Sequence, residues 1–455
     1  MVRSVVATLL FALAIPAVAA EWELVNIIET PATTADAVRL TKGTPDSANL
    51  NRFGFYSDLV FDTKTGAWFA LSDRGPGGGL IDYATRVQRL NIPFDAATGA
   101  IGQPLIERTI IFKHEDGQVF NGLNPKDLNG NVATLGLSFD PEGLAIGKGG
   151  HFYVADEYGP SVYEFSSSGH FIRAFATPEN LVARTSTGAL DYVATRPDIT
   201  SGRQDNRGFE GLTLNTSGDK LYAVMQDPLV NEGSNNNDGR RSRNVRMVEF
   251  DVASGSATAQ YAYRLEPIAA INAIDPSTAD DFSATNQGRS IGLSAIHALS
   301  DTEFLVLERD NRGLGVEVTG TPLHKRVYRI SLAGASDISA VSLAGSNDLP
   351  AGVVAVGKAP ELDILAALRA AGAQDIPEKL EGLAIGPRLA DGRHLVLIGS
   401  DNDYSVTQTG AGVQFEVCVD RTTGERAQVE LDAACPVGLQ RIPGTLVSFA
   451  VDFSH

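Results

Sequence analysis

The chain has 455 residues, of which 43% are hydrophobic and 20% are charged, and it contains 46 glycines and 21 prolines. This apolar content supports a full hydrophobic core and excludes a disordered or collagen-like chain. The formal net charge is −18, from 37 Lys and Arg against 55 Asp and Glu. An acidic surface repels the phosphate backbone of nucleic acids, so we expect no nucleic-acid partner and favour cations as ligands.

The first twenty residues have the three regions of an export signal. Arg3 provides the positive charge, residues 5–15 the apolar segment, and Ala17 to Ala20 the small residues of a cleavage site. We expect cleavage after Ala20, which leaves residues 21–455 as a single domain. No later apolar segment approaches the ~20 residues that span a bilayer. The sequence therefore predicts a periplasmic or secreted protein without a membrane partner.

The chain contains two cysteines, Cys418 and Cys435, and both lie near the C-terminus. Because an exported protein meets an oxidising environment, we expect a disulfide between them. Closure of a loop of this length is worth about 3 kcal/mol in the chain-entropy model. The bond is expected to stabilise a late loop and to take no part in catalysis.

One pattern recurs along the chain: an acidic residue and a glycine, an apolar segment, a short turn, a second apolar segment and a further acidic residue. Three copies begin with Glu-Gly-Leu, at Glu142, Glu210 and Glu381. Weaker copies begin near Asp58 and Ile291. Short apolar segments separated by turn residues predict β-hairpins, and their repetition predicts a β-propeller or another closed array.

Further strand candidates complete the hairpins into four-stranded units. The candidate third strands are residues 87–90, 162–165, 247–250 and 327–330, and one fourth strand is 259–265. Five visible units and the two chain ends predict an all-β propeller of about six four-stranded blades with long loops between strands. Residues 22–28 and 446–453 can share one blade, which protects the sheet edges. The best helix candidate is 360–372.

The acidic residues of the repeats converge if the hairpins form a propeller. In an antiparallel hairpin, the residue before the first strand and the residue after the second lie at the same end. The candidate metal ligands that this rule gathers are Glu142, Glu210, Glu381, Asp156, Asp227 and Asp401. Two carboxylates about 5 Å apart repel by roughly 3 kcal/mol at an effective dielectric of about 20. The group must therefore separate, protonate, pair with arginine or hold a cation, and its oxygen ligands favour calcium ahead of magnesium.

Two arginines and a histidine are candidate catalytic residues. Arg74 and Arg309 flank acidic residues of the weaker repeats, where they can pair with carboxylates or bind an anionic group of a substrate. His297 is a candidate general base, and a histidine satisfied within the core is the alternative. For the acidic residues, the alternative is that they simply end strands at tight turns. The sequence contains no serine-hydrolase elbow, zinc-protease motif or phosphate-binding glycine loop.

The segments around these residues resemble the phytase-like family of exported bacterial proteins, known by its "esterase-like activity of phytase". The resemblance runs from about Asn51 to Phe449, and the segments that carry it are Phe139-Asp140-Pro141-Glu142-Gly143-Leu144, residues 152–158, residues 206–212 and residues 379–383. It implies a β-propeller and the hydrolysis of phosphate or other esters. The related β-propeller phytases use several calcium ions, but the ligand residues given above come from the repeats alone.

The leading interpretation is a calcium-dependent hydrolase of a small-molecule ester, with phosphate esters as the first substrate class. The three repeat glutamates would hold the ion, assisted by the three aspartates, and Arg74 and Arg309 would stabilise developing negative charge. One alternative is a lactonase or carboxylesterase on the same scaffold, and another is a non-catalytic binding propeller stabilised by calcium. The acidity of the chain counts against a polyanion such as phytate unless bound calcium reverses the local charge.

Overall fold

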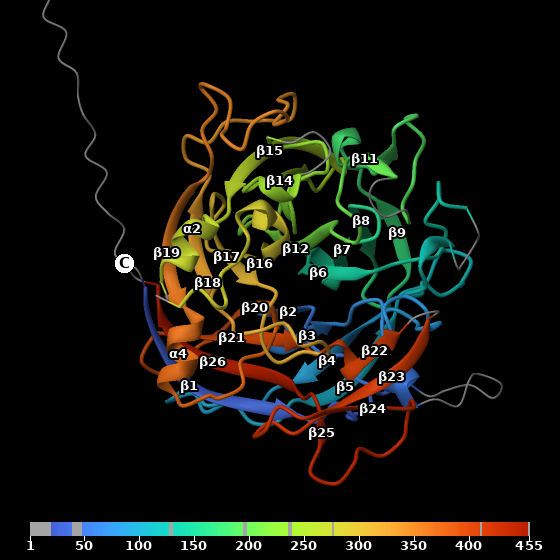
Figure 1. Ribbon diagram of the computed structural model, residues 1–455, viewed down its shortest axis with the longest axis vertical. Helices are drawn as coiled ribbons and strands as arrows, with labels where there is room; N and C mark the ends of the chain where they lie inside the picture. Colours follow the sequence, from blue (N-terminus) through green and yellow to red (C-terminus); the bar gives the residue numbers. More distant parts are fainter. Residues whose placement is uncertain are drawn as a thin grey trace, which may run out of the picture.

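The computed structural model describes residues 20–38, 48–126, 131–193, 198–234, 239–274, 277–409 and 412–453. Antiparallel sheets of four strands dominate this part of the chain (Figure 1). Residues 1–19 of the predicted signal segment lie outside the described residues. The removal of this segment stays a prediction. Among the described residues, no helix combines the length and hydrophobicity that crossing a membrane requires.

Five sheets share one plan, in which the first strand lies innermost and the following strands pair outward. Four of them are formed by consecutive strands: β2 (Asp58–Asp62), β3 (Ala67–Leu71), β4 (Arg86–Asn91) and β5 (Leu105–Ile111); β6 (Pro141–Ile146), β7 (Phe152–Asp156), β8 (Ser161–Phe165) and β9 (Phe171–Ala174); β12 (Phe209–Leu214), β13 (Lys220–Met225), β14 (Asn244–Asp251) and β15 (Ser256–Arg264); β16 (Ile291–Ala298), β17 (Glu303–Asp310), β18 (Lys325–Ser331) and β19 (Gly357–Asp363). The predicted hairpins and third strands are confirmed.

The fifth sheet joins the two ends of the described chain. Its order is β20 (Lys379–Arg388), β21 (His394–Asp401), β26 (Gly444–Asp452) and β1 (Glu21–Thr30). Trp22 of β1 is opposite Val451 of β26, as expected for terminal strands that share one blade. The ends complete the unit begun by β20 and β21, so they do not form a separate blade.

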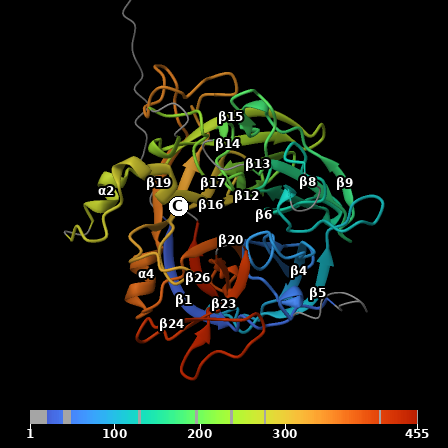
Figure 2. The same ribbon diagram turned by 45° about the vertical axis from the view of Figure 1, so that its right-hand side comes forward.

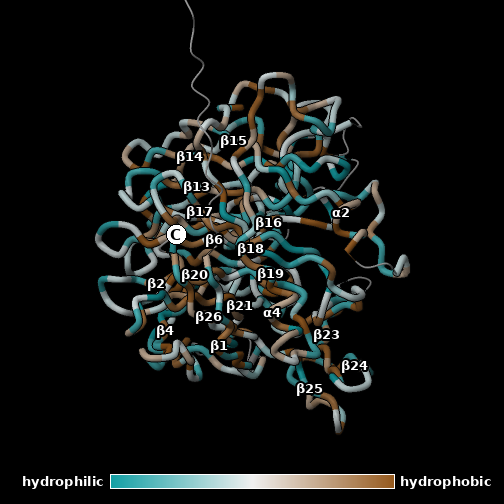
Figure 3. Tube along the Cα trace, turned by 90° about the vertical axis from the view of Figure 1, so that its left-hand side faces the viewer, coloured by the Kyte–Doolittle hydropathy of each residue, from teal (hydrophilic) through white to brown (hydrophobic). Residues whose placement is uncertain are grey.

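The five inner strands contact one another in circular order, β2, β6, β12, β16, β20 and again β2, around the centre of Figure 1. This is the predicted all-β propeller arrangement, but the described residues form five sheets around the axis and not the expected six or so, because the terminal strands complete the β20–β21 sheet. A sixth sheet contains β22 (Val406–Thr409), β23 (Val413–Val419), β24 (Arg426–Val429) and β25 (Gln440–Arg441). It lies outside the ring, below it in Figure 2 and projecting from it in Figure 3.

The Glu-Gly-Leu repeat has one structural meaning in all three copies. The pairing register skips Glu142 in β6, Glu210 in β12 and Glu381 in β20, so each glutamate is the extra residue of a β-bulge. A bulge redirects the side chain of its extra residue, here toward the axis. The leucines that follow, at 144, 212 and 383, are buried in the core between the sheets.

The repeat glycines allow neighbouring inner strands to approach closely. A Cβ atom on Gly143 would lie 2.7 Å from the backbone nitrogen of Leu212 in β12. One on Gly211 would lie 2.9 Å from the backbone nitrogen of Ile296 in β16. Because both contacts are with backbone of the next blade, a side chain at either position would force the blades apart.

The disulfide between Cys418 and Cys435 is confirmed, with the two Cα atoms 5.7 Å apart. It lies within the sixth sheet. That sheet is anchored by a buried ion pair between Arg52 and Glu416, whose N–O distance is 2.7 Å, and by the Gln414 amide, which donates to the backbone oxygen of Gly77 at 3.0 Å. The N-terminal loop and the first blade therefore hold the sheet in place.

The remaining elements are short. The helix expected at 360–372 is shorter than predicted: α4 covers Ile364–Ala370, because Asp363 caps it by accepting from the backbone of Ala366, and Pro360 belongs to β19. The other short elements are α2 (Ile268–Asn272), α3 (Gln287–Ser290), β10 (Arg184–Thr185), β11 (Ile199–Ser201) and the 3-10 helices Ala48–Asn51, Lys148–Gly150, Glu179–Leu181, Gly239–Arg241, Ala284–Asn286 and Asp403–Ser405.

The close approach at Gly211 gives a stability test of the ring. We expect Gly211→Ala to lower the free energy of unfolding by roughly 2 kcal/mol, since the added methyl group overlaps the backbone of β16. Gly357→Ala in the outer strand β19 is the matched control, because a Cβ there meets its nearest atoms at 3.6 Å. The control should stay within about 1 kcal/mol of the wild type. Equal effects in urea unfolding would contradict this account.

Candidate functional site

The N-terminal ends of the inner strands surround a cavity of about 320 Å³. Its lining is strongly charged and contains both carboxylates and cations. The charged lining residues are Asp73, Arg74, Glu142, Glu157, Arg207, Glu210, Asp227, Arg289, Arg309, Glu317, Glu378, Lys379 and Glu381. Residues from all five blades thus meet at this end of the ring, which we call the mouth.

Six of the nine residues proposed from the sequence line this cavity: the three repeat glutamates, Asp227, Arg74 and Arg309. Asp401 lies beside the cavity and is buried. Asp156 lies beneath it, where its carboxylate accepts from the backbone nitrogens of Asp140, Tyr158 and Gly159 at 2.9, 3.2 and 3.1 Å. Those bonds make Asp156 a turn-stabilising residue.

His297 does not join the other candidates. It lies near the C-terminal end of β16 and lines a different cavity with Asp58, Leu144, Leu212 and other largely apolar residues. Burial there lowers the pKa of His297 to about 4. The inner strands separate it from the acidic mouth, because the residues of β16 that line the mouth are Gly292 and Ser294 at its other end.

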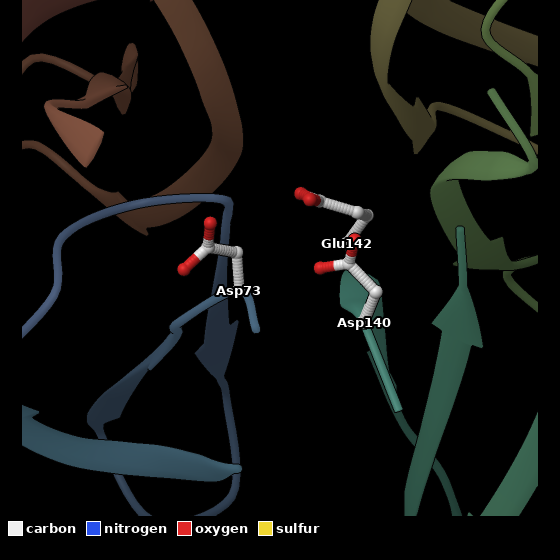
Figure 4. Close-up of side chains that lie close together, drawn as sticks. All are labelled: Asp73, Asp140 and Glu142. Carbon is white, nitrogen blue, oxygen red and sulfur yellow. The ribbon is translucent and has the colours of Figure 1, made fainter. Parts of the chain in front are cut away.

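Three carboxylates form a compact cluster at the edge of the cavity. One oxygen each of Asp73, Asp140 and Glu142 lies within 4.8 Å of the other two, and all three residues are buried. Figure 4 shows the side chains of Asp140 and Glu142 pointing from the second blade toward Asp73 of the first blade. An all-oxygen set of this kind fits a hard divalent cation.

Glu142 is the unusual member of this cluster. It is only 8% exposed, and the described residues offer its carboxylate no hydrogen bond or ion pair. Burial raises its pKa well above the ordinary range, and the nearby carboxylates of Glu210, Asp140 and Glu381 raise it further. A buried carboxylate without a partner is costly, so this position favours a ligand that supplies positive charge.

Arg74 and Asp140 connect the first and second blades. The Arg74 guanidinium pairs with Asp140 at 2.9 Å, and the Arg74 backbone nitrogen donates to the same carboxylate at 3.0 Å. The guanidinium also donates to the side-chain oxygen of Asn206. Asp140 is therefore held in place by Arg74, and its second-blade neighbour Glu142 is left without such support.

A second cluster shares Asp73 with the first. Oxygens of Asp73, Asp401 and Asp403 lie within 4.8 Å of one another, and the Lys379 ammonium lies 3.3 Å from Asp401 and 2.6 Å from Asp403. Although burial acts to lower it, the pKa of Lys379 is raised well above its usual value by Asp403 and Asp401. Asp401, one of the candidate metal ligands, is thus paired with a lysine.

Glu381 and Glu210 differ from Glu142 in having partners. The buried Arg309 guanidinium pairs with Glu381 and donates to the Ser294 hydroxyl at 2.8 Å. The Gln226 amide donates to one oxygen of Glu210, whereas the other oxygen is buried without a hydrogen-bond partner. Burial and the carboxylates of Glu157 and Glu381 raise the pKa of Glu210.

Arg207 is a loosely held cation between two carboxylates. Its nitrogens lie 3.4 Å from Glu157 and 3.7 Å from Asp227, and 39% of its side chain is exposed. Asn206, which precedes it, has a left-handed backbone with φ of 47° and donates to Glu157 at 2.7 Å. The segment before β12 therefore presents both an amide and a guanidinium to the cavity.

Sequence reasoning missed several residues of this site. Asp73, Asp140, Glu157, Arg207, Lys379 and Asp403 were not among the candidates, although all lie within a few residues of the repeats. One signal was available: Asp73 follows β3 in the same way that Asp227 follows β13, so the hairpin rule applies to it. The same signal applies to Asp403, which follows the end of β21, and a left-handed turn of Asp403, Tyr404 and Ser405 brings it back toward the mouth.

A family model with the description "Phytase-like: Esterase-like activity of phytase" matches residues 51–404. An uncharacterized secreted protein of Arthroderma benhamiae is 30% identical over 312 residues, which cover 59% of this chain and 58% of the relative's length. The disulfide between Cys418 and Cys435 fits an extracellular location.

Similarities to solved structures are distant. The PorZ component of the type-IX secretion system of Porphyromonas gingivalis has a TM-score of 0.33 at 14% identity, covering 81% of this chain and 33% of PorZ. Virginiamycin B lyase from Staphylococcus aureus has a TM-score of 0.29 at 11% identity, covering 84% of this chain and 97% of the lyase. The architecture therefore rests on the strand pairing described above.

The contrast between Glu142 and Glu381 predicts opposite effects of the same substitution. In the presence of a chelator, we expect Glu142→Gln to raise the free energy of unfolding by roughly 2 kcal/mol, because an uncompensated carboxylate is removed. Glu381→Gln should lower it by about 3 kcal/mol, since it leaves Arg309 buried without its partner. Urea unfolding at neutral pH measures both, and a shift in the same direction for both variants would refute the assignment.

The raised carboxyl pKa values also predict a pH dependence. Burial is the leading cause that raises the pKa of Asp227 to about 6, of Asp401 and Glu378 to about 7 and of Glu157 to about 8. At pH values above 3.8 and 4.5 these groups ionise in the unfolded chain, whereas the folded protein keeps them protonated to higher pH. The free energy of unfolding therefore falls as the pH rises.

In chelator, we expect the unfolding free energy to decline between about pH 5 and 8, by about 1.4 kcal/mol per pH unit for each such group. A chelated protein whose thermal stability is constant or rising over the same range would show that these groups do not titrate as described.

Proposed function

The chain belongs to the phytase-like family, characterised by the esterase-like activity of phytase, and we propose that it is an exported, metal-dependent hydrolase of phosphate esters. Membership of this family indicates that the protein is, in general terms, an esterase-like hydrolase. The metal, the phosphate ester and the roles of individual residues are our proposal. The charged cavity at the mouth of the inner strands is the site of the reaction in this proposal.

The residues best suited to hold the ion are Asp73, Asp140 and Glu142. Their oxygens lie within 4.8 Å of one another, and within the described part of the chain Glu142 has no competing partner. Of the candidate ligands inferred from the sequence, Glu142 keeps this role, while Glu210, Glu381, Asp227 and Asp401 face other partners and Asp156 supports a turn. Calcium suits three buried carboxylates best, with magnesium as the second choice.

A bound divalent ion would supply Lewis-acid polarisation of an ester oxygen and a lowered pKa of water at neutral pH. The chain supplies the remaining functions. Arg207 and Arg309 face the cavity from the blades opposite Asp73 and can stabilise negative charge on the phosphoryl oxygens. Arg74 keeps Asp140 oriented through its two contacts with that carboxylate.

Glu210 is suited to hold and donate a proton. One of its oxygens accepts from Gln226, and the other is buried and unpartnered at the cavity wall. Burial and the carboxylates of Glu157 and Glu381 raise its pKa, which favours the protonated form of the carboxyl. Such a group can protonate the leaving oxygen of an ester.

The observation that carries the proposal is the unpartnered, buried Glu142 beside Asp73 and Asp140 in a cavity that also contains arginines. A purely structural cluster would be expected to pair each carboxylate, as Arg309 does for Glu381. The carboxylates favour a cation, and the arginines favour an anion that approaches it. A phosphate ester satisfies both.

The test is a substrate panel with controlled metal content. Purified mature protein is stripped with chelator and assayed on 4-nitrophenyl phosphate, bis(4-nitrophenyl) phosphate, 4-nitrophenyl acetate and a δ-lactone, with and without added calcium or magnesium. We expect phosphate-ester hydrolysis that depends on calcium. Glu142→Gln should reduce it by roughly 100-fold through loss of the ion, and Glu210→Gln by a similar factor through loss of the proton donor.

Glu303→Gln at the far end of β17 is the matched control and should keep wild-type activity, since its carboxylate lies away from the cavity. Metal-dependent turnover of the lactone or acetate alone would instead identify a lactonase or carboxylesterase. Phosphate-ester hydrolysis that proceeds equally fast in chelator would rule out the metal role. If no substrate is turned over and calcium raises only the melting temperature, the protein is a non-catalytic binding propeller that calcium stabilises.

A further inference from the structure

Two groups of carboxylates meet at Asp73, and together they define two adjacent cation positions. Asp73, Asp140 and Glu142 surround the first, and Asp73, Asp401 and Asp403 surround the second. Adjacent positions bridged by a carboxylate are the arrangement with which hydrolases hold two metal ions. In this chain the second position already contains a cation, the Lys379 ammonium, 2.6 Å from Asp403 and 3.3 Å from Asp401.

The backbone is built to keep Lys379 in this position. Lys379 is the first residue of β20 and pairs directly with Asp401, the last residue of β21. Immediately afterwards, Asp403, Tyr404 and Ser405 have φ values of 48°, 56° and 58°. Left-handed conformations at non-glycine residues cost free energy and persist where the surrounding structure enforces them. Here the turn returns Asp403 to the ammonium.

Lys379 also faces the reaction space. It lines the cavity, and 27% of its side chain is exposed, whereas Asp401 is 3% exposed. The ammonium is therefore held by two carboxylates on one side and open to the cavity on the other. A purely structural ion pair needs no such opening.

We propose that Lys379 is a built-in second cation: it excludes a metal ion from the Asp73-Asp401-Asp403 position and presents positive charge to the anionic group of the substrate. The protein then binds one divalent ion, at Asp73, Asp140 and Glu142. This inference rests on the proposed metal-dependent function for that first ion. Because the Lys379 side chain occupies the second cation position, the site holds a single metal ion in this proposal.

The experiment is a count of bound ions, independent of activity. Wild type, Lys379→Met and Lys379→Arg are stripped with chelator, equilibrated with excess calcium, freed of unbound ion and measured for calcium per chain by elemental analysis and by titration calorimetry. We expect one ion in the wild type, two in Lys379→Met, where the second position loses its ammonium, and one in Lys379→Arg, which keeps a cation.

The matched control is Lys220→Met, which removes a lysine paired with Glu249 at 3.2 Å on an outer hairpin and should leave the count at one. Lys379→Gln provides the same test should the methionine variant fail to fold, as judged by circular dichroism. Two ions in the wild type, or one ion in both Lys379→Met and Lys379→Gln, would overturn the inference. No ion in the wild type would instead refute the proposed metal-dependent function, so the two failures are distinguishable.

Discussion

The close approach of neighbouring inner strands is the constraint on which the site depends. In two of the Glu-Gly-Leu segments the glycine, Gly143 or Gly211, lies where the next blade leaves no room for a Cβ atom, and at Gly382 a Cβ would meet its nearest atoms at 3.2 Å. In all three segments the leucine lies in the core between the blades. Directly before these two fixed points the backbone bulges, and the glutamate turns toward the axis. Packing of the ring and convergence of the carboxylates are therefore two results of the same three residues.

This convergence concentrates negative charge in a buried place, and the chain compensates for it unevenly. Glu381 has Arg309, Asp140 has Arg74, and Asp401 has Lys379. Glu142 has none of these within the described residues, and one oxygen of Glu210 is also unpartnered. The unpaired groups lie where substrate and ion are proposed to bind, as expected if stability has been given up locally for function.

The sixth sheet adds a feature that the repeat does not contain. The match to the family ends at residue 404, and β22 begins at Val406. From there the sheet contacts loops of two blades: Gln414 binds the backbone of Gly77 in the first, and Arg426 donates to the backbone of Gly315 at 2.7 Å in another. Both loops adjoin residues of the cavity lining. The disulfide-bonded segment thus braces the rim of the mouth from outside the ring.

The sequence by itself determined the all-β architecture, the hairpins, the sharing of a blade by the terminal strands, the disulfide pairing and the meeting of Glu142, Glu210 and Glu381. The strands, the hairpins and the ends at which the glutamates lie follow from local periodicity and from the rule of antiparallel pairing, which act over a few residues. The disulfide follows from the presence of two cysteines in an exported chain, and the shared blade from the need to protect sheet edges. It did not determine that the chain ends complete the β20–β21 blade, that His297 faces away from the mouth, or that Asp73 and Asp140 stand beside Glu142. Nor did it show which carboxylates are neutralised by Arg309, Arg74 and Lys379. Those facts depend on how separate blades are placed around the axis, and contacts between blades are set by packing across hundreds of residues, which no local pattern encodes.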